Sequence, residues 1–179
     1  MLHSLDVQLF YFLNNLAGQS SWGDALILFC ANYLAYLMGA LFVGLLVFKA
    51  WPKREKLILL FIAGVSTFLA RGVITEAIRY FYHRPRPFSV LPVHQLMTDS
   101  AWSFPSGHAT FFFALSTAVY LYNRRWGVWF FVASVFITLA RVAAGVHYPS
   151  DIIAGALIGC ITAYLSAILT LRYLDKKAH

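Results

Sequence analysis

The sequence predicts an all-α integral membrane protein, a helical bundle of about five transmembrane helices preceded by a short amphipathic helix. Hydrophobic residues make up 60% of the 179 residues and charged residues only 12%, and the mean hydropathy is +0.69. Charged residues make up about a quarter of an ordinary soluble domain, so the composition excludes that class. With no internal repeat and no low-complexity linker, we expect residues 1–179 to form a single membrane domain.

Five apolar stretches match the length needed to cross a hydrocarbon core of about 30 Å. They cover residues 24–49, 57–82, 105–122, 127–146 and 151–174, and the third and fourth are near the short limit. Ahead of them, residues 1–20 predict an interfacial helix, because one face, opposite Asn14, carries Leu5, Leu9, Phe12, Leu13 and Leu16. This segment has no basic start and no small-residue cleavage pattern, so we do not interpret it as a signal peptide.

The basic residues predict which end of the bundle faces the cytoplasm. Nine of the 14 Lys and Arg residues lie in the first inter-span segment, in the 122–127 turn and at the C-terminal end: Lys49, Lys53, Arg54, Lys56, Arg124, Arg125, Arg172, Lys176 and Lys177. Cytoplasmic loops of membrane proteins are enriched in Lys and Arg, so we expect these segments to be cytoplasmic. The 83–104 loop and the 147–151 turn are then extracytoplasmic.

The formal net charge of +7 raises the question of nucleic-acid binding. The cations are divided between one rim of the bundle and three short motifs, without a basic stripe that alternates with exposed aromatic residues. We therefore expect no nucleic-acid partner. Cys30 and Cys160 fall inside apolar spans without CxxC spacing or a nearby histidine, so we interpret them as apolar filler.

The first polar motif stands where the second span ends. Arg79 is followed after six residues by Arg86-Pro87, and Pro85 and Pro87 stop the helix and hold the chain extended. Arg86 can then turn back over the helix end and share an anion with Arg79, because a guanidinium matches two phosphate oxygens at once. Snorkelling at a lipid boundary is the alternative for either arginine alone.

The second motif, Pro105-Ser106-Gly107-His108, opens the third span. Free backbone N–H groups and the helix dipole make a helix N-terminus an anion site. Ser106 adds a hydroxyl donor, Gly107 lets a phosphate approach the backbone closely, and His108 is within reach of the same anion. An ordinary serine cap followed by a tolerated histidine is the alternative.

The third motif joins the fourth span to the fifth and contains Arg141, His147 and Asp151. The Asp151 carboxylate is close enough to accept one ring N–H of His147, which leaves the other ring nitrogen as a nucleophile. The alternative is that Asp151 merely caps the fifth span. Cleaving a phosphate requires an attacking group on one side and a proton for the departing oxygen on the other. His147 suits the attack, and His108 suits the protonation.

These motifs, in this order between Arg79 and Asp151, resemble the type 2 phosphatidic acid phosphatase superfamily, which has a chloroperoxidase-like helical fold. The resemblance implies a reaction without metal or cofactor through a phosphohistidine on His147, with His108 as general acid. It implies that the phosphate is held by Arg79, Arg86, Ser106, Gly107 and Arg141. The family usually has lysine at position 79 and serine at position 140, where this chain has Arg79 and Ala140. Neither change removes a group that makes or breaks a bond.

Within this superfamily the chain is similar to the undecaprenyl-diphosphate phosphatases of the bacitracin-resistance type. The resemblance implies a multi-pass protein of the bacterial cytoplasmic membrane with an outward-facing site and a polyprenyl diphosphate as substrate. A phosphatidylglycerophosphate or phosphatidic acid phosphatase is the first alternative, and a non-enzymatic permease is a remote one. Nothing in the sequence indicates an oligomeric state.

Two more arginines, Arg71 and Arg84, are candidates for contact with a second phosphate. Arg71 lies deeper in its span, about 18 Å below His83 at 1.5 Å per residue, and the interpretation that we favour is an ion pair with Glu76 or a contact with a polar group on another helix. A metal site built from the histidines and aspartates of the outer side is disfavoured, because the arginines there oppose a dication and favour an anion.

Overall fold

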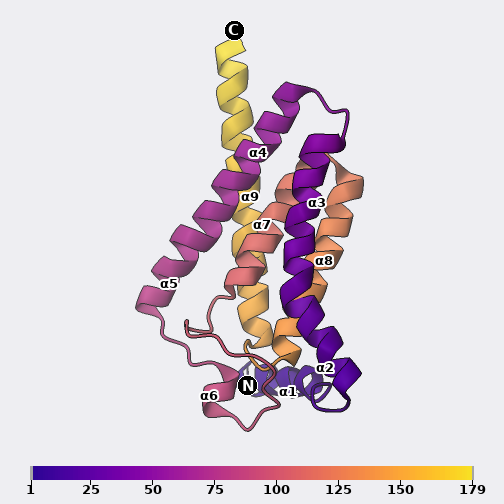
Figure 1. Cartoon of the computed structure of the whole chain (residues 1–179). Coiled ribbons are helices and arrows are strands. Elements are labelled where there is room, and N and C mark those ends of the chain that lie inside the picture. The colour runs from indigo at the N-terminus through magenta and orange to yellow at the C-terminus, as the bar shows by residue number, and fades with distance from the viewer. Residues whose placement is uncertain (1, 179) are drawn as a thin grey trace.

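The computed structural model describes residues 2–178, and this part of the chain is helical without a strand. A short helix α1 is followed by long helices that form a bundle (Figure 1). Two of the long helices contain a π-helical segment, η1 or η2. The elements in chain order are α1 (Leu2–Asn14), α2 (Ser21–Leu28), η1 (Phe29–Tyr33), α3 (Leu34–Phe48), α4 (Lys53–Thr67), η2 (Phe68–Ile74), α5 (Thr75–Phe81), α6 (Pro87–Val90), α7 (Gly107–Tyr122), α8 (Arg124–Ala143) and α9 (Pro149–Ala178).

Within the described residues, four helices are long and apolar enough to cross a membrane: Ser21–Phe48, Lys53–Phe81, Arg124–Ala143 and Pro149–Lys177. The fifth expected span is α7, which has only 16 residues, fewer than the about 20 that a membrane crossing requires. Ten of those residues are buried, because α7 packs among α4, α8 and α9. The bundle therefore consists of four long helices around a shorter central one.

Some expected helix ends shift by a few residues for local reasons. The first span begins at Ser21 because the Ser20 hydroxyl accepts a hydrogen bond from the N–H of Gly23 at 3.1 Å. Helix α7 begins at Gly107 because Ser106 is extended and caps it. Helix α8 ends at Ala143, before the expected residue 146, because the chain turns at Gly145 with a φ of +86°, a conformation that glycine adopts without a Cβ clash.

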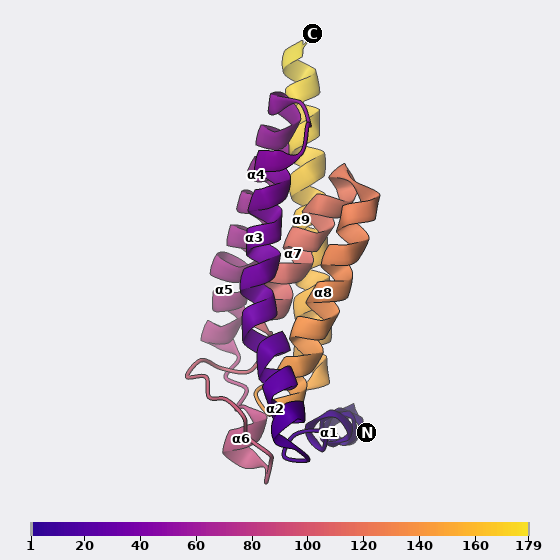
Figure 2. The ribbon, with the colours of Figure 1, turned by 45° about the vertical axis from the view of Figure 1, so that its right-hand side comes forward.

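Helix α1 lies across one end of the bundle, roughly perpendicular to the long helices (Figures 1 and 2). Its buried side carries Asp6, Phe10 and Asn14, whereas Leu5, Leu9, Phe12 and Leu16 are exposed. Asn14 ties α1 to the bundle, because its Nδ2 donates to the carbonyl groups of His94 and Ala143, both at 2.8 Å. The side of α1 that carries Asp6, Phe10 and Asn14 thus faces the protein, and the side that carries Leu5, Leu9 and Phe12 faces outward.

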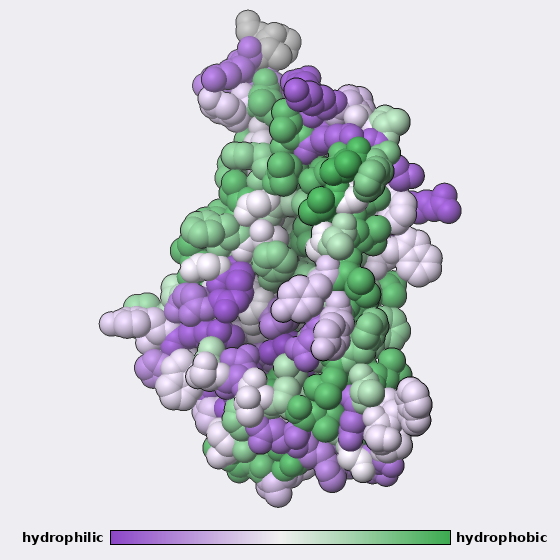
Figure 3. Space-filling model, viewed as in Figure 1, coloured by the Kyte–Doolittle hydropathy of each residue, from purple (hydrophilic) through white to green (hydrophobic). Residues whose placement is uncertain are grey.

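The two ends of the bundle carry different helices, loops and polar motifs. Helix α6 and the loops around it lie at the same end as α1, whereas the α3–α4 turn and the C-terminal end of α9 lie at the opposite end (Figure 1). Figure 3 shows hydrophilic side chains gathered over the lower part of this face and again near the top, with mostly hydrophobic side chains between them. The α1 end contains the three polar motifs.

Candidate active site

The three motifs meet at the α1 end because each stands where a helix begins or ends. Arg79 is in the last turn of α5, and Arg86 precedes α6 in extended backbone. The second motif starts α7. Arg141 is in the last turn of α8, and His147 lies in the turn that leads to Asp151 in the first turn of α9.

Arg86 is the most extensively bonded of the buried arginines. Its Nε donates to the carbonyl of Ala101 at 2.6 Å, and its Nη1 donates to the carbonyl of Val146 at 2.8 Å. The same Nη1 lies 3.4 Å from Nε2 of His147. These bonds fix the guanidinium beside the ring nitrogen that the sequence indicates as the nucleophile.

Arg79 and Arg141 are also buried, with 5% and 2% of their surface exposed. Arg79 donates through Nη2 to the carbonyl of Pro105 at 3.0 Å, and Nη1 of Arg141 lies 3.4 Å from Nε2 of His108. The Nε atoms of both arginines find no hydrogen-bond partner among the described residues. Unpartnered buried donors are costly, so an anion that reached them would be stabilised.

Asp99 joins the first motif to the third, and sequence reasoning did not assign it to the site. Its Oδ2 lies 2.9 Å from Nη2 of Arg86 and 3.2 Å from Nη2 of Arg141. Burial alone would raise the pKa of Asp99, but Arg86 and Arg141 hold it below its ordinary value. The available signal was that Asp99 is the only acidic residue between positions 83 and 104.

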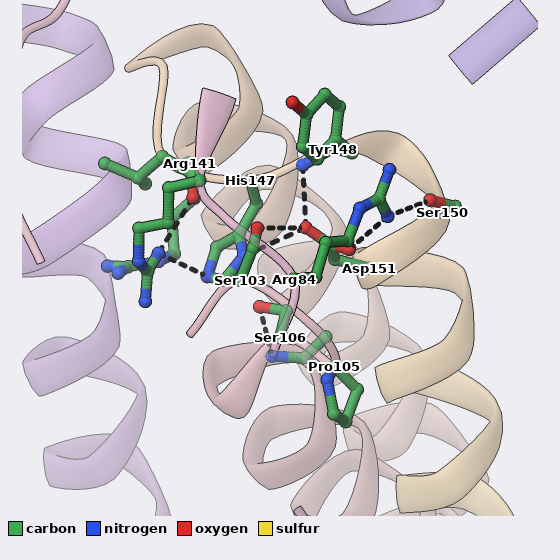
Figure 4. Close-up of polar contacts among 12 residues, drawn as sticks. Arg84, Ser103, Pro105, Ser106, Arg141, His147, Tyr148, Ser150 and Asp151 are labelled. Carbon is green, nitrogen blue, oxygen red and sulfur yellow. Dashed lines mark hydrogen bonds and ion pairs between the residues drawn. The ribbon is translucent and has the colours of Figure 1, made fainter. Parts of the chain in front are cut away.

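His147 and Asp151 lie side by side in the closed interior, with 1% and 0% of their surface exposed. Nδ1 of His147 is 3.4 Å from Oδ2 of Asp151, a long contact that does not meet the geometry of a hydrogen bond. The same oxygen accepts hydrogen bonds from the Ser103 hydroxyl at 2.5 Å and the Tyr148 N–H at 2.9 Å (Figure 4). Ser103 is thus a second residue of the candidate site, after Asp99, that sequence reasoning missed.

The protonation state of His147 follows from its surroundings. Burial lowers its pKa to about 4, and the nearby Arg86 acts in the same direction, against the opposing effect of Asp151. His147 is therefore neutral near pH 7. If its proton is on Nδ1, toward Asp151, the lone pair of Nε2 points toward Arg86.

At the start of α7, the space beside Gly107 that we expected to admit a phosphate is occupied by another side chain. The Ser106 hydroxyl caps the helix by accepting from the N–H of Ala109 at 3.4 Å. A Cβ on Gly107 would lie 2.4 Å from Nε of Arg71, so the space beside this glycine holds the Arg71 side chain. Arg71 also forms an ion pair with Glu76, as we favoured from the sequence.

The structure turns Arg84 away from the arginines just described. Its guanidinium contacts Asp6, Ser150 and Asp151, on the far side of Asp151 from His147 (Figure 4). Because its donors already serve these partners, we leave Arg84 out of the phosphate-binding set. A contact from Arg84 to a second phosphate stays a prediction.

The comparison with known proteins agrees with this geometry. A family model described as PAP2 superfamily matches residues 55–174. The bacitracin transport permease protein BcrC of Bacillus licheniformis is 30% identical over 162 residues, which cover 89% of this chain and 77% of that protein. The undecaprenyl-diphosphatase BcrC of Bacillus subtilis is 26% identical over 162 residues, which cover 90% of this chain and 82% of that protein.

A solved structure extends the comparison to three dimensions. The crystal structure of Aquifex aeolicus LpxE matches with a TM-score of 0.70 and 29% identity, covering 90% of this chain and 94% of that one. The predicted all-helical membrane fold and the family that the motifs resemble are both confirmed. With a family model over more than half of its length and a matching fold, this chain belongs to the PAP2 superfamily.

Proposed function

We propose that this protein is a membrane lipid phosphatase that hydrolyses undecaprenyl diphosphate to undecaprenyl phosphate and phosphate. One observation carries the proposal: two histidines each have Nε2 at 3.4 Å from an arginine, and both arginines contact the same carboxylate oxygen of Asp99. A carboxylate held by two guanidinium groups marks a position suited to a phosphate oxygen. An anion at that position lies between the nitrogen that would attack and the one that would supply a proton.

In the first step of the proposed reaction, Nε2 of neutral His147 attacks the terminal phosphorus. The bond from that phosphorus to the bridging oxygen breaks, and His108 gives its proton to the departing undecaprenyl phosphate. Arg79, Arg86 and Arg141 balance the charge on the equatorial oxygens. Asp151 stabilises the positive charge that the ring of His147 acquires, as the carboxylate of a catalytic triad does.

In the second step, His108 takes a proton from a water molecule while the water oxygen attacks the phosphorus of the phosphohistidine. The P–N bond breaks, His147 recovers its lone pair, and phosphate leaves. The sum of the two steps is one diphosphate and one water converted to one lipid monophosphate and one phosphate. Each proton and electron pair is accounted for by these two histidines and the water.

A cavity beside His108 supports a lipid as the substrate. It has a volume of about 490 Å³ and lies between the η1–α3 segment and the start of α7. Its polar end is formed by Arg71, Gly107 and His108, and its walls include Ala35, Gly39 and Phe111. A cavity whose lining is mostly apolar but includes a charged arginine suits a molecule with a hydrocarbon tail and a phosphate head. The name of the Bacillus subtilis relative specifies the polyprenyl diphosphate.

We further propose that the site faces the extracytoplasmic side of a bacterial cytoplasmic membrane. The nine cations at the other end of the chain's spans support this orientation. In a variant whose native cysteines are replaced, a membrane-impermeant thiol reagent should label Cys at position 94 in intact cells and spare Cys at position 53. Labelling of position 53 alone would reverse the orientation.

The assay that tests the activity is phosphate release by the purified protein from undecaprenyl diphosphate, phosphatidylglycerophosphate and phosphatidic acid. We expect the highest kcat/KM for the diphosphate and undiminished turnover after prolonged EDTA treatment. Faster turnover of phosphatidylglycerophosphate or phosphatidic acid would favour the alternative substrates. No release from any of them, with bacitracin efflux instead, would favour the permease alternative that the Bacillus licheniformis name raises.

A further inference from the structure

Arg84 lies between two buried carboxylates at the side of the site away from His147. Its Nη1 is 2.6 Å from Oδ1 of Asp151, and its Nη2 is 2.6 Å from Oδ2 of Asp6. The guanidinium also stacks over the ring of Tyr148, 4.0 Å from the ring centre. The side chains of Asp6, Arg84 and Asp151 are 10%, 15% and 0% exposed. Charge-assisted bonds with so little access to water are among the stronger polar contacts in proteins.

Asp6 comes from α1, far from the three motifs in sequence, and it holds the start of α9 as well as Arg84. Its Oδ1 accepts a hydrogen bond from the N–H of Ser150 at 2.9 Å, and its Oδ2 accepts one from the Ser150 hydroxyl at 2.6 Å. The Ser150 hydroxyl in turn accepts from Nη1 of Arg84 at 2.7 Å. Asp6 therefore fixes both the guanidinium and the residue that precedes Asp151.

The two oxygens of Asp151 serve different partners. Oδ1 accepts from Arg84, whereas Oδ2 accepts from Ser103 and from the backbone of Tyr148 and lies nearest to Nδ1 of His147. Because Arg84 holds Oδ1, rotation of the carboxylate about its Cβ–Cγ bond would break that bond. The arrangement keeps Oδ2 directed at the imidazole.

We propose that Asp6 and Arg84 are positioning residues for the Asp151 carboxylate, so that helix α1 is part of the catalytic machinery and not only a membrane-surface anchor. The inference rests on the proposed function, in which Asp151 orients His147 and stabilises its charged form. Asp6 acts through Arg84 and Ser150, and both act through Asp151. Neither Asp6 nor Arg84 touches the substrate in this scheme.

The test is a double-mutant cycle on the full-length protein in detergent. Asp6→Asn keeps the size of the side chain but removes the charge that holds Arg84. We expect kcat to fall by about 10- to 100-fold, the range seen for residues that orient the ligands of catalytic metals. KM should change by less than about twofold. Asp6→Glu should recover part of the loss. Gln8→Ala, at an exposed position of the same helix, should match the unmodified protein in kcat and in thermal unfolding.

The second arm asks whether Asp6 works through Asp151. In an Asp151→Asn background, Asp6→Asn should cause no further loss of residual turnover, because residues that act as a unit are not additive. The inference would be overturned if Asp6→Asn lowered kcat by the same factor in both backgrounds, or if it changed only KM. Asp6 would then only attach α1 to the bundle. If Asp6→Asn does not fold, Arg84→Lys takes its place in the same cycle with the same expected non-additivity.

If turnover is too slow to follow, a spectroscopic measurement can test whether Asp6 affects the tautomer of His147. In protein labelled with ¹⁵N-histidine at pH 7, the His147 signals, identified by their loss in His147→Ala, should show the Nδ1–H tautomer. Asp6→Asn should raise the fraction of the Nε2–H tautomer, and an unchanged ratio would contradict the inference. Failure of the proposed function looks different: the unmodified protein would release no phosphate, or His147→Ala would remain active.

Discussion

The Oδ2 atom of Asp99 lies 2.9 Å from Nη2 of Arg86, within hydrogen-bond distance of an arginine that our proposal assigns to phosphate. The same oxygen reaches Arg141 at 3.2 Å, while 29% of the Asp99 side chain is exposed. His147 is buried, with 1% of its surface exposed. A phosphate that binds Arg86 and Arg141 must therefore displace the Asp99 carboxylate, which competes with it by charge.

The first prediction concerns this competition. Asp99→Asn should bind inorganic phosphate more tightly, because the variant removes a negative charge that must leave the two arginines before phosphate binds. A charge-assisted hydrogen bond contributes about 1.5–3 kcal/mol, so the competitive inhibition constant should fall by about 10- to 100-fold. Asp175→Asn, at an exposed position near the C-terminal end of α9, is the matched control. Weaker inhibition by phosphate in Asp99→Asn would contradict the idea that Asp99 competes for the site.

The second prediction concerns pH. The attack requires neutral His147, whose pKa burial lowers from 6.5 to about 4. The active form therefore persists well below the pH at which an exposed histidine becomes protonated. On the acid side, log(kcat/KM) should stay level down to about pH 5 and fall with an apparent pKa of about 4.

The pH profile should be measured with a substrate whose own ionisation has been determined, at pH values where the fold is intact. The sign for stability is the same as for activity. Between about pH 6.5 and 4 the unfolded chain binds a proton at His147 that the folded protein does not, so the folded state loses stability as the pH falls through that range. An acid limb near 6.5 would mean that His147 is hydrated in the working enzyme.

The sequence located the motif residues that the structure brings together better than it located the residues that support them. Arg79, Arg86, His108, Arg141, His147 and Asp151 stand at or next to the ends of helices, where turn residues interrupt the apolar runs, so periodicity and turn signals locate them. The structure brings Nε2 of His147 and of His108 each to 3.4 Å from an arginine. The number of spans was harder to predict. The sequence predicted five, but α7 has only 16 residues, and four described helices are long and apolar enough to cross a membrane.

The sequence pattern did not predict the contact of Ser103 with Asp151, nor the contacts of Arg84 with Asp6 and Asp151. Asp6 and Ser150 are 144 positions apart, and nothing in their local sequences indicates a pairing. Leucines on one side of α1 are exposed, and their pattern did not indicate that Asp6, Phe10 and Asn14 on the other side would be buried against the bundle. Such pairings depend on how separate helices pack, which local propensity does not encode.

The third prediction concerns the contact between α7 and α9, which supports both histidine motifs. A Cβ on Gly159 would lie 2.5 Å from the carbonyl oxygen of Thr110 and 2.8 Å from the backbone nitrogen of Ala114. Backbone atoms of a buried helix cannot yield as a side-chain end can. Gly159→Ala should therefore force α7 away from α9 and lower the free energy of unfolding by about 1–3 kcal/mol.

Unfolding in detergent micelles, followed by circular dichroism, measures this effect. Gly64→Ala is the matched control, because no heavy atom of the described residues outside its own helix backbone and chain neighbours lies within 4 Å of the added Cβ. Alanine has the higher helix propensity, by about 0.8–1.0 kcal/mol, so the control should be neutral or slightly more stable. Equal stability of Gly159→Ala and the unmodified protein would show that the two helices have room to separate.

The last prediction separates the two histidines. If His147 forms the phosphohistidine, His147→Ala should abolish turnover of every substrate, because the variant lacks the ring whose Nε2 lies beside Arg86 and whose Nδ1 lies beside Asp151. In the first step His108, beside Arg141, supplies the proton for the departing oxygen, and in the second step it takes a proton from water. Its loss should therefore matter most when the leaving group is a poor one.

General-acid catalysis typically contributes about 10²- to 10⁴-fold. In the formation of the phosphohistidine, His108→Ala should lose that much with phosphatidic acid, whose alkoxide leaving group needs a proton, and clearly less with p-nitrophenyl phosphate, whose phenolate leaves without one. Initial rates with both substrates, and rapid-quench detection of acid-labile phosphoprotein, measure the difference: His108→Ala should still become phosphorylated by p-nitrophenyl phosphate, whereas His147→Ala should not. Equal losses for both variants with both substrates would show that the two histidines do not divide the reaction in this way, even if lipid phosphatase activity itself were established.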